Sequence, residues 1–404
     1  MIESMAAGIY ISVPFCRTKC SFCNFASDVF SKSAYENYVA RVVEDVSHSR
    51  QFANELECEL EPTADSIYLG GGTPSILDGP QLLRIFKAVR EEFTVTPDAE
   101  ITVECAPGTI TPALIETFLQ CGVNRVSLGL QSFVDQEAQA VGRLHNRATV
   151  LEEIARLRHA GLHNISLDLI AGLPHQTPES WAFSVSETIA TGVPHVSIYM
   201  LEVDDESRLG KELIAGGARY HAHFVPDEDA TADFYQQACE TLESAGVKQY
   251  EISNFAASED KRSIHNLKYW TRQPYIGFGV DAHSMLEKAV GQEGAVRFAT
   301  PDSLDTYMNR TPPTVTPVSQ QAAVEESFFL GLRLNGGVDL AEKRRDVTHE
   351  CAIHQCIQDG LLEQAGTIIR LTPRGRLLSN EVFGRFLADE AEETKVGTGN
   401  VNPR

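Results

Sequence analysis

Long apolar runs are absent from this chain of 404 residues, in which the longest are strand-sized segments such as ISLDLIAGL. A membrane-spanning helix needs about 20 consecutive apolar residues, so the sequence excludes an integral membrane protein. The N-terminal stretch MIESMAAGIYISVPF also lacks the basic region of a secretory signal peptide. We therefore expect a cytoplasmic protein that associates with a membrane at most transiently.

Basic residues are scarce, with 34 Lys and Arg against 56 Asp and Glu, which gives a formal charge of -22. Binding to nucleic acid phosphates depends on clustered Lys and Arg, so we expect no nucleic acid partner. Cysteine is also sparse, at nine residues. Six of them are scattered singly and indicate reduced thiols rather than a disulfide framework: Cys58, Cys105, Cys121, Cys239, Cys351 and Cys356.

Short β-branched or apolar runs alternate with segments of helical period from residue 9 to about 286. The expected strands are 9–13, 66–71, 100–105, 125–131, 165–173, 195–201, 249–255 and 275–282. The expected helices are 33–55, 79–93, 111–121, 135–160, 178–190 and 229–246. This alternation predicts an α/β fold, a full or partial (β/α) barrel with parallel strands over residues 1–286.

Polar residues end several of the expected strands, as in YLGGGTP, TVECAPG, LGLQSF and LDLIAGLP. In a (β/α) barrel the chemistry lies at the carboxyl ends of the strands. Such residues are therefore site candidates, although each could instead complete a hydrogen-bond network in the barrel core.

The C-terminal part has a different pattern. Residues 287–316 contain Gly, Pro and Thr and are interpreted as a linker, and 317–388 as a small winged-helix-like α+β module. Winged helices often bind DNA, but the acidity of this chain favours a packing or partner role. The tail 389–404 is polar and is expected to be disordered.

Three cysteines, Cys16, Cys20 and Cys23, directly follow the first expected strand in FCRTKCSFCN. A structural zinc site usually has four protein ligands, often from two C-x-x-C pairs, and no second pair follows here. A [4Fe-4S] cluster also takes thiolates, and three of them leave one iron open for another ligand. Zinc or incidental thiols are the alternatives.

The stretch YISVPFCRTKCSFC resembles the cluster-binding loop of the radical S-adenosylmethionine superfamily. In that superfamily C-x3-C-x2-C binds a [4Fe-4S] cluster, and the amine and carboxylate of S-adenosylmethionine occupy the open iron. Further ordered blocks are similar to the group that contains oxygen-independent coproporphyrinogen dehydrogenase and a related haem chaperone. They are GGGTPS (70–75), RVSLGLQSF (125–133), GRLHN (142–146), LDLIAGLPHQTPESW (167–181), YEISNFA (250–256), HNLKYW (265–270), GFGVDAHS (277–284) and LTPRGRLLSNEVF (371–383).

The resemblance implies a site for S-adenosylmethionine at the strand ends. Its expected residues are Tyr10, Gly71, Gly72, Thr73, Glu104, Gln131, Arg143 and Asp168, with a looser match near Glu202 and His283. The glycines could instead form only a tight turn, and Tyr10 could be a wall aromatic. Two positions depart from the group: Ser12 stands where a His is common, and Ala106 where an Asn is common.

Three features separate the members of the group. The dehydrogenase has a fourth cysteine two residues after the third and a longer N-terminal extension, whereas this chain has Phe25 there and only fifteen residues before Cys16. The chaperone also has the motif H-N-x-x-Y-W, present here from His265 to Trp270. The resemblance therefore implies a haem chaperone rather than a coproporphyrinogen dehydrogenase.

If the H-N-x-x-Y-W block is helical, His265 and Tyr269 share a face, and Trp270 is adjacent. An imidazole and two aromatic rings could then contact one haem, with His265 as axial ligand. A core histidine beside packing aromatics is the alternative. The pair His221 and His223 is interpreted as ordinary surface.

We thus expect a protein that binds a [4Fe-4S] cluster, S-adenosylmethionine and haem, and that delivers haem to acceptor proteins. The alternatives are oxidative decarboxylation of coproporphyrinogen III and a radical methyltransferase activity. The sequence leaves the acceptor, the oligomeric state and the covalent or non-covalent nature of haem binding open.

Overall fold

The structure is a computed structural model, and it describes residues 6–289, 291–343, 345 and 347–387. The expected disordered tail 389–404 lies outside these residues. The chain divides into two compact units. One contains the described residues up to Tyr269 together with Gln273–Pro317, and the other contains Trp270–Arg272 and the described residues from Val318 onward.

The larger unit is built on a 12-stranded sheet whose central strands are parallel. In chain order these are β1 (Ala7–Val13), β2 (Thr63–Gly71), β3 (Thr94–Cys105), β4 (Arg125–Gln131), β5 (Asn164–Ala171) and β6 (His195–Met200), each paired with the next. The sheet continues beyond β6 through β8 (Asn254–Ala256) to β7 (Lys248–Gln249). Beyond β1 it continues through β9 (Tyr275–Phe278), β10 (His283–Glu287), β11 (Ala295–Ala299) and β12 (Thr314–Val318).

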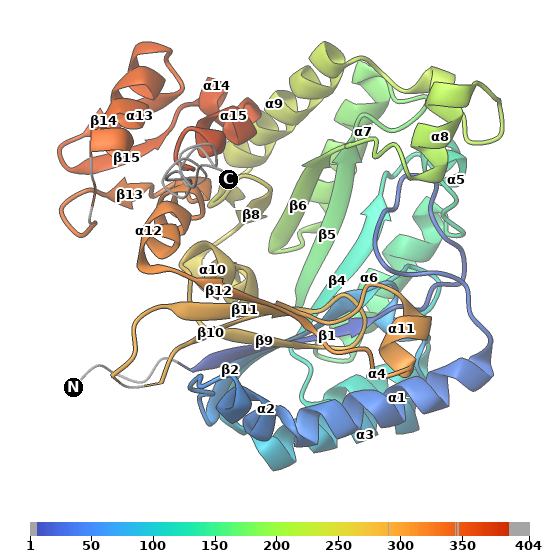
Figure 1. Cartoon of the computed structure of the whole chain (residues 1–404). Coiled ribbons are helices and arrows are strands. Elements are labelled where there is room, and N and C mark those ends of the chain that lie inside the picture. The colour runs from blue at the N-terminus through green and yellow to red at the C-terminus, as the bar shows by residue number, and fades with distance from the viewer. Residues whose placement is uncertain (1–5, 290, 344, 346, 388–404) are drawn as a thin grey trace, which may run out of the picture. The chain divides into compact units, whose positions relative to one another are not determined.

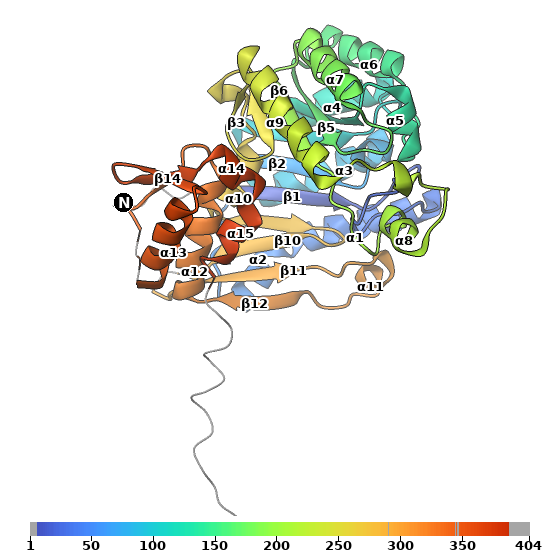
Figure 2. The same ribbon diagram turned by 90° about the horizontal axis from the view of Figure 1, so that it is seen from above.

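The parallel part is a partial (β/α) barrel, which confirms the expected fold class. Its strands curve from β9 and β1 round to β6, with helices on the outer face (Figures 1 and 2). Because β12 and β7 end the strand order in the described part of the chain, the sheet does not close there. The crossover helices are α1 (Lys32–Ser47), α2 (Ser49–Glu55), α3 (Gly79–Glu92), α4 (Pro112–Cys121), α5 (Asp135–Ala140), α6 (Arg147–His159), α7 (Pro178–Thr191) and α9 (Glu228–Ser244).

Local sequence sets the ends of these helices. Thr111 accepts a hydrogen bond from the Leu114 N–H at the start of α4, and Pro112 fits the first turn. Gly122 ends α4 at φ +75°, a conformation that suits glycine. The buried face of α4 includes Leu114, Ile115 and Phe118. The ends of the helices thereby help to set the position of the carboxyl end of each strand.

Several segments differ from the expectation, and 33–55 is one of them, because it is divided into α1 and α2 at His48. The 135–160 segment is two helices, α5 and α6, because Gly142 turns the chain at φ +86° between them. The 249–255 segment is also interrupted, because the fully buried Glu251 carboxylate accepts hydrogen bonds from Ser253 N–H and the Asn254 amide and forms a turn. The hairpin of β7 and β8 results.

The interpretation of 287–316 as a linker is also wrong. This segment carries β11, α11 (Leu304–Met308) and most of β12, which extend the main sheet. Pairing is the physical reason, because β11 lies antiparallel to β10 from His283 opposite Ala299 to Glu287 opposite Ala295. The larger unit therefore runs to Pro317 rather than ending at 286.

The smaller unit combines helices with a three-stranded antiparallel sheet. Its strands are β13 (Val338–Asp339), β15 (Ile368–Leu371) and β14 (Leu362–Ala365), in that order. Its helices are α12 (Gln320–Phe329), α13 (Val347–Gln358), α14 (Pro373–Leu377) and α15 (Ser379–Gly384). The stacked rings of Phe328 and Phe386, with centroids 5.2 Å apart, lie in its core. The expected helix, two short strands around 363–367 and following helix are present.

Within the described residues, no helix has both the length and the apolar character required to cross a membrane.

Candidate functional site

The loop after β1 carries the three cysteines and is held at both of its ends. Cys16 N–H donates to Asp28 O at 3.0 Å and Asp28 N–H to Pro14 O at 3.0 Å, so the loop returns to its own start. Its far side is fixed to the segment after α5, where Thr18 Oγ1 donates to Gly142 O at 2.9 Å and Ser21 N–H to Val141 O at 3.2 Å. Several hydrogen bonds to backbone carbonyls therefore hold the loop that carries the cysteines.

The glycine-rich turn after β2 lies directly against this loop. Gly72 N–H donates to Val13 O and Thr73 N–H to Phe15 O, both at 2.8 Å. A Cβ atom on Gly72 would lie only 2.7 Å from Val13 O, so no larger residue fits without a shift. Thr73 Oγ1 donates to Cys16 Sγ at 3.7 Å. The turn thus brings backbone close to the first cysteine.

A cavity of about 320 Å³ opens at the carboxyl ends of the strands, within the size range of small-molecule sites. Most of the expected residues line it: Cys16, Cys20, Cys23, Gly71, Gly72, Thr73, Glu104, Gln131, Arg143 and Asp168. Ala106 and Glu202 line it too, whereas His265, Tyr269, Trp270 and His283 do not. Residues from six successive strands, β1 to β6, or their following loops therefore meet at one place.

Glu104 ends β3 and is positioned by a residue that sequence analysis missed. The Tyr68 hydroxyl donates to Glu104 Oε1 at 2.7 Å. Burial raises the pKa of Glu104 to about 7, with the charge of Asp168 adding to the effect and the Tyr68 hydrogen bond opposing it. A carboxylate with this pKa changes its charge near neutral pH.

The carboxylate of Asp168 and the guanidinium of Arg143 bring groups of opposite charge to the cavity. Ser127 Oγ donates to both carboxylate oxygens of Asp168 at 3.0 Å, which fixes that side chain in place. Burial raises the pKa of Asp168, although hydrogen bonds from Ser197 and Ser127 lower it. The buried Nε of Arg143 has no hydrogen-bond partner among the described residues. A guanidinium in this state is suited to an incoming carboxylate.

Gln131 lines the cavity, whereas Tyr10 lies near the glycine-rich turn that borders it. Gln131 is buried at the end of β4 with φ +73°, an unusual conformation for a residue other than glycine. The Tyr10 hydroxyl does not line the cavity, but it would lie 3.5 Å from a Cβ atom on Gly71, and the Ser12 hydroxyl 3.0 Å from it. Ser12 therefore occupies the space behind the glycine-rich turn.

The donor set fits the groups that the resemblance implies. Within the described residues, no three His, Cys, Asp or Glu side chains are gathered to hold one metal ion. A cubane offers a different iron to each thiolate, so the three cysteines need not converge on one point. The unpaired Nε of Arg143 suits a carboxylate. The carboxylates of Glu104 and Asp168 suit an ammonium or ribose hydroxyls. The missing side chain at Gly72 lets a bound group approach the main chain.

His265, expected as a haem ligand, lies in the core instead of a pocket. It is 1% exposed, and both ring nitrogens have partners: Nδ1 lies 3.0 Å from Ser66 Oγ, and Nε2 2.8 Å from the Tyr269 hydroxyl. Its ring stacks on Tyr68 at 5.3 Å. Burial and the neighbouring Lys268 lower its pKa to about 3, so it is neutral at pH 7. This geometry favours the core alternative for His265.

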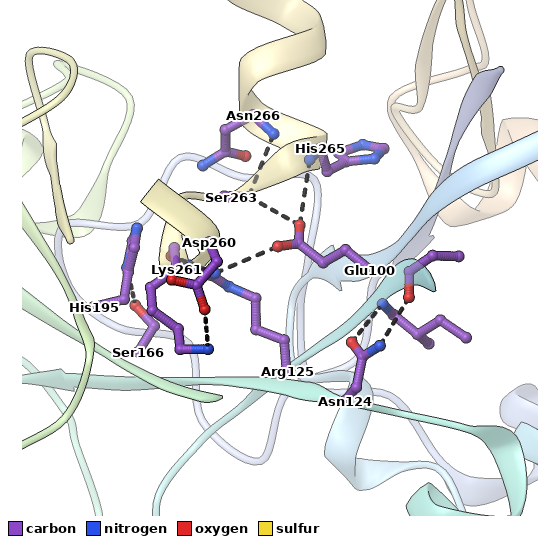
Figure 3. A network of polar contacts seen from close by, with 12 residues as sticks. Glu100, Asn124, Arg125, Ser166, His195, Asp260, Lys261, Ser263, His265 and Asn266 are labelled. Carbon is purple, nitrogen blue, oxygen red and sulfur yellow. Dashed lines mark hydrogen bonds and ion pairs between the residues drawn. The ribbon is translucent and has the colours of Figure 1, made fainter. Parts of the chain in front are cut away.

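The main chain of His265 belongs to a second polar network, which is drawn in Figure 3. Its N–H donates to Glu100 Oε1 at 3.2 Å, and Glu100 pairs with Arg125 at 3.3 Å. The helix α10 (Ile264–Trp270) does place His265 and Tyr269 on one face, as the spacing predicted. Trp270 belongs to the smaller unit, in which the Arg333 guanidinium lies 4.1 Å from the centroid of its ring.

Comparisons with known proteins agree with the fold. The model of the radical SAM superfamily matches residues 10–186, and that of the HemN C-terminal domain matches residues 318–378. A solved structure of coproporphyrinogen III oxidase (HemN) from Escherichia coli has a TM-score of 0.79 and 21% identity, and the match covers 94% of this chain and 90% of that one. This likeness shows the shared fold.

Curated relatives match over almost their whole length. Heme chaperone HemW of Bacillus subtilis (strain 168) is 30% identical over 393 residues, which are 94% of this chain and 99% of that protein. Heme chaperone HemW of Lactococcus lactis subsp. lactis is 31% identical over 94% of this chain and 97% of that protein. The chain therefore belongs to the radical SAM superfamily and, within it, to the family of the heme chaperone HemW.

Proposed function

We propose that this protein is a haem chaperone that holds a [4Fe-4S] cluster and S-adenosylmethionine in the strand-end cavity, and that binds haem for delivery to acceptor proteins. The observation that carries the proposal is the three-cysteine loop facing the cavity, with Phe25 rather than a fourth cysteine beyond it. The names of the full-length relatives support the same conclusion. Phe25 is 62% exposed and lines the cavity, so no thiolate is available there.

The thiols and the charged residues of the cavity have separate parts in this proposal. The thiolate ligands are Cys16, Cys20 and Cys23. When bound, a cluster with one open iron would supply one electron to the sulfonium of S-adenosylmethionine. Arg143 pairs with the methionyl carboxylate through its unpaired nitrogen. Glu104 and Asp168 accept hydrogen bonds from the ammonium and ribose hydroxyls.

Coproporphyrinogen III decarboxylation remains the second candidate because the fold is shared with HemN. The test is to reconstitute the protein anaerobically and to supply haem and coproporphyrinogen III in separate reactions, the second with S-adenosylmethionine, a low-potential reductant and an electron acceptor. We expect haem to bind and then to move to an apo-haem protein, with coproporphyrinogen III unchanged. Steady formation of protoporphyrinogen would contradict the chaperone proposal.

The raised pKa of Glu104 gives this proposal a pH dependence. A carboxylate with a pKa of about 7 is mostly protonated below pH 7 and gains its charge as the pH rises. If the charged form holds the cationic cofactor, affinity for S-adenosylmethionine at pH 6 should be about tenfold below its plateau above pH 8, since one pKa unit corresponds to a factor of ten.

Equilibrium dialysis of S-adenosylmethionine against reconstituted protein at several pH values would measure this dependence. Glu104→Gln should bind weakly throughout and lose the slope between pH 6 and 8. Glu116→Gln, on the exposed side of α4, is the control and should keep it. An equal slope in Glu104→Gln and the unaltered protein would assign the titration to another group.

A further inference from the structure

The position of His265 raises the question of which imidazole meets haem iron. Axial ligation needs a ring nitrogen without another partner, and His265 uses both of its nitrogens. His195 is also buried, with Nδ1 2.7 Å from Ser166 Oγ and Nε2 3.0 Å from the Tyr250 hydroxyl. The buried His145 points Nε2 at Leu130 O. Surface histidines beside apolar groups are therefore the candidates.

One group of histidines lies around a single exposed aromatic ring. The rings of His175 and His223 each lie 4.1 Å from the ring of Phe224, and that of His221 lies 6.3 Å from it. His175 Nε2 is 3.2 Å from His221 Nδ1. We call His175, His221, His223 and Phe224 the imidazole cluster. It follows β5 and β6, whose carboxyl ends also border the cofactor cavity.

The backbone of the imidazole cluster is held in an unusual conformation. His175 and His221 have φ of +69° and +61°, values that cost energy in residues other than glycine. Glu212 of α8 (Arg208–Ala215) compensates by accepting the backbone N–H groups of Arg219, Tyr220 and Ala222. His175 N–H donates to Phe224 O at 3.0 Å. The cluster is therefore formed in advance by contacts from three segments.

His223 and Phe224 are the accessible members. Phe224 is 47% exposed, although the rings of His175 and His223 lie against it. His223 is exposed, and within the described part of the chain no hydrogen bond occupies its ring nitrogens. Arg219, two residues before His221, is an exposed cation on the same loop. The imidazole of His223 suits the iron of a haem, and the ring of Phe224 suits its flat macrocycle. The guanidinium of Arg219 suits its carboxylates.

We propose that the imidazole cluster is a haem-binding surface, with His223 as the axial ligand of the iron and Phe224 packed against the macrocycle. This inference rests on the proposed haem-binding function and assigns a place to it. The paired His175 and His221 form the base on which the Phe224 ring rests. An exposed ligand suits a protein that must hand its haem to an acceptor, because the acceptor can approach without unfolding the carrier.

The same segment connects the imidazole cluster with the cysteine loop. At the start of α8, Leu209 N–H donates to Ser21 O at 2.8 Å and Arg208 Nη1 to Lys19 O at 3.3 Å. Glu212, further along the same helix, fixes the loop that carries His221. One short helix thus contacts both the cysteine loop and the loop that carries His221.

Haem titration into the anaerobically reconstituted protein, followed by Soret absorbance, tests this proposal. His223→Ala should weaken haem binding at least about tenfold, the loss that even removal of an outer partner of a metal ligand commonly causes. Its Soret band should shift, and added imidazole should restore the original spectrum. His163→Ala, an exposed histidine before β5, is the matched control and should bind as the unaltered protein does.

The outcomes separate this inference from the proposed function. If the unaltered protein binds no haem, the chaperone proposal itself fails. If it binds haem and His223→Ala does so with the same affinity and spectrum, the imidazole cluster is not the site while the chaperone proposal stands. Loss of the ligand spectrum in His265→Ala alone, with its circular dichroism unchanged, would also overturn the assignment to His223.

Discussion

Replacing Cys16, Cys20 and Cys23 together by Ala is expected to abolish cluster binding completely. The anaerobically reconstituted variant should contain no bound iron or acid-labile sulfide and should lose the broad visible absorption of iron–thiolate charge transfer. The reason is that thiolates are the ligands that Fe–S clusters require, and among the described residues Cys105 is the one further cysteine that lines the cavity. Cys105 cannot substitute readily, because burial raises the pKa of its thiol far above neutrality.

Loss of the cluster should leave the fold intact in this variant. The loop is fixed by backbone hydrogen bonds at Cys16 and Asp28 and by the Thr18 hydroxyl, none of which involves a thiol. Far-ultraviolet circular dichroism should therefore match that of the unaltered protein. Cys351→Ala, an exposed cysteine of the smaller unit, is the control and should retain the full iron content. A colourless unaltered protein with bound zinc would instead support the zinc alternative.

Much of the barrel and its cavity follows from patterns along the chain. The strands are short apolar runs that alternate with segments of helical period, and the polar residues that end them meet because parallel strands bring their carboxyl ends to one edge. Glu104 and Asp168 could be expected at the cavity for this reason. Tyr68 and Ser127 could not, because each acts on a residue of the neighbouring strand, and the pairing register is not visible in one sequence.

The errors have related causes. The 287–316 segment has the composition of a loop, and the exposed side chains of β12 give it no clear alternation, so only its position at the sheet edge reveals it as strand. For His265 the spacing gave the correct helical face, but it could not tell which way that face points. The partners that bury it, Ser66 and Glu100, lie about 165 or more residues away in sequence.

Glu100→Ala is expected to produce the largest loss of stability among the substitutions considered. Glu100 and Arg125 are 6% and 2% exposed, and they form an ion pair at 3.3 Å. Removing one partner leaves the other charge buried without compensation, which costs about 3–5 kcal/mol. Glu100 also accepts from Ser263 Oγ and His265 N–H, so the variant loses the contacts that hold the start of α10 on β3 (Figure 3).

Urea unfolding followed by far-ultraviolet circular dichroism would measure this effect. Glu91→Ala is the matched control, because its ion pair with Lys87 at 3.6 Å has both side chains about two-thirds or more exposed. Exposed pairs contribute about 0–1 kcal/mol, so the control should change the unfolding free energy little. Equal, small losses in both variants would contradict a structural role for the Glu100–Arg125 pair.

The Glu100–Arg125 pair lies away from the cofactor cavity, so its loss should lower the stability of the protein without changing cofactor binding. Arg125 begins β4 and lies opposite Thr102 of β3, at the end of the strands away from the cysteine loop. In (β/α) barrels this face contributes to stability, while the opposite face carries the chemistry. Glu100→Ala protein that is still folded in the absence of urea should therefore bind S-adenosylmethionine with unchanged affinity. A matching loss of affinity would show that the two ends of the barrel are coupled through the strands.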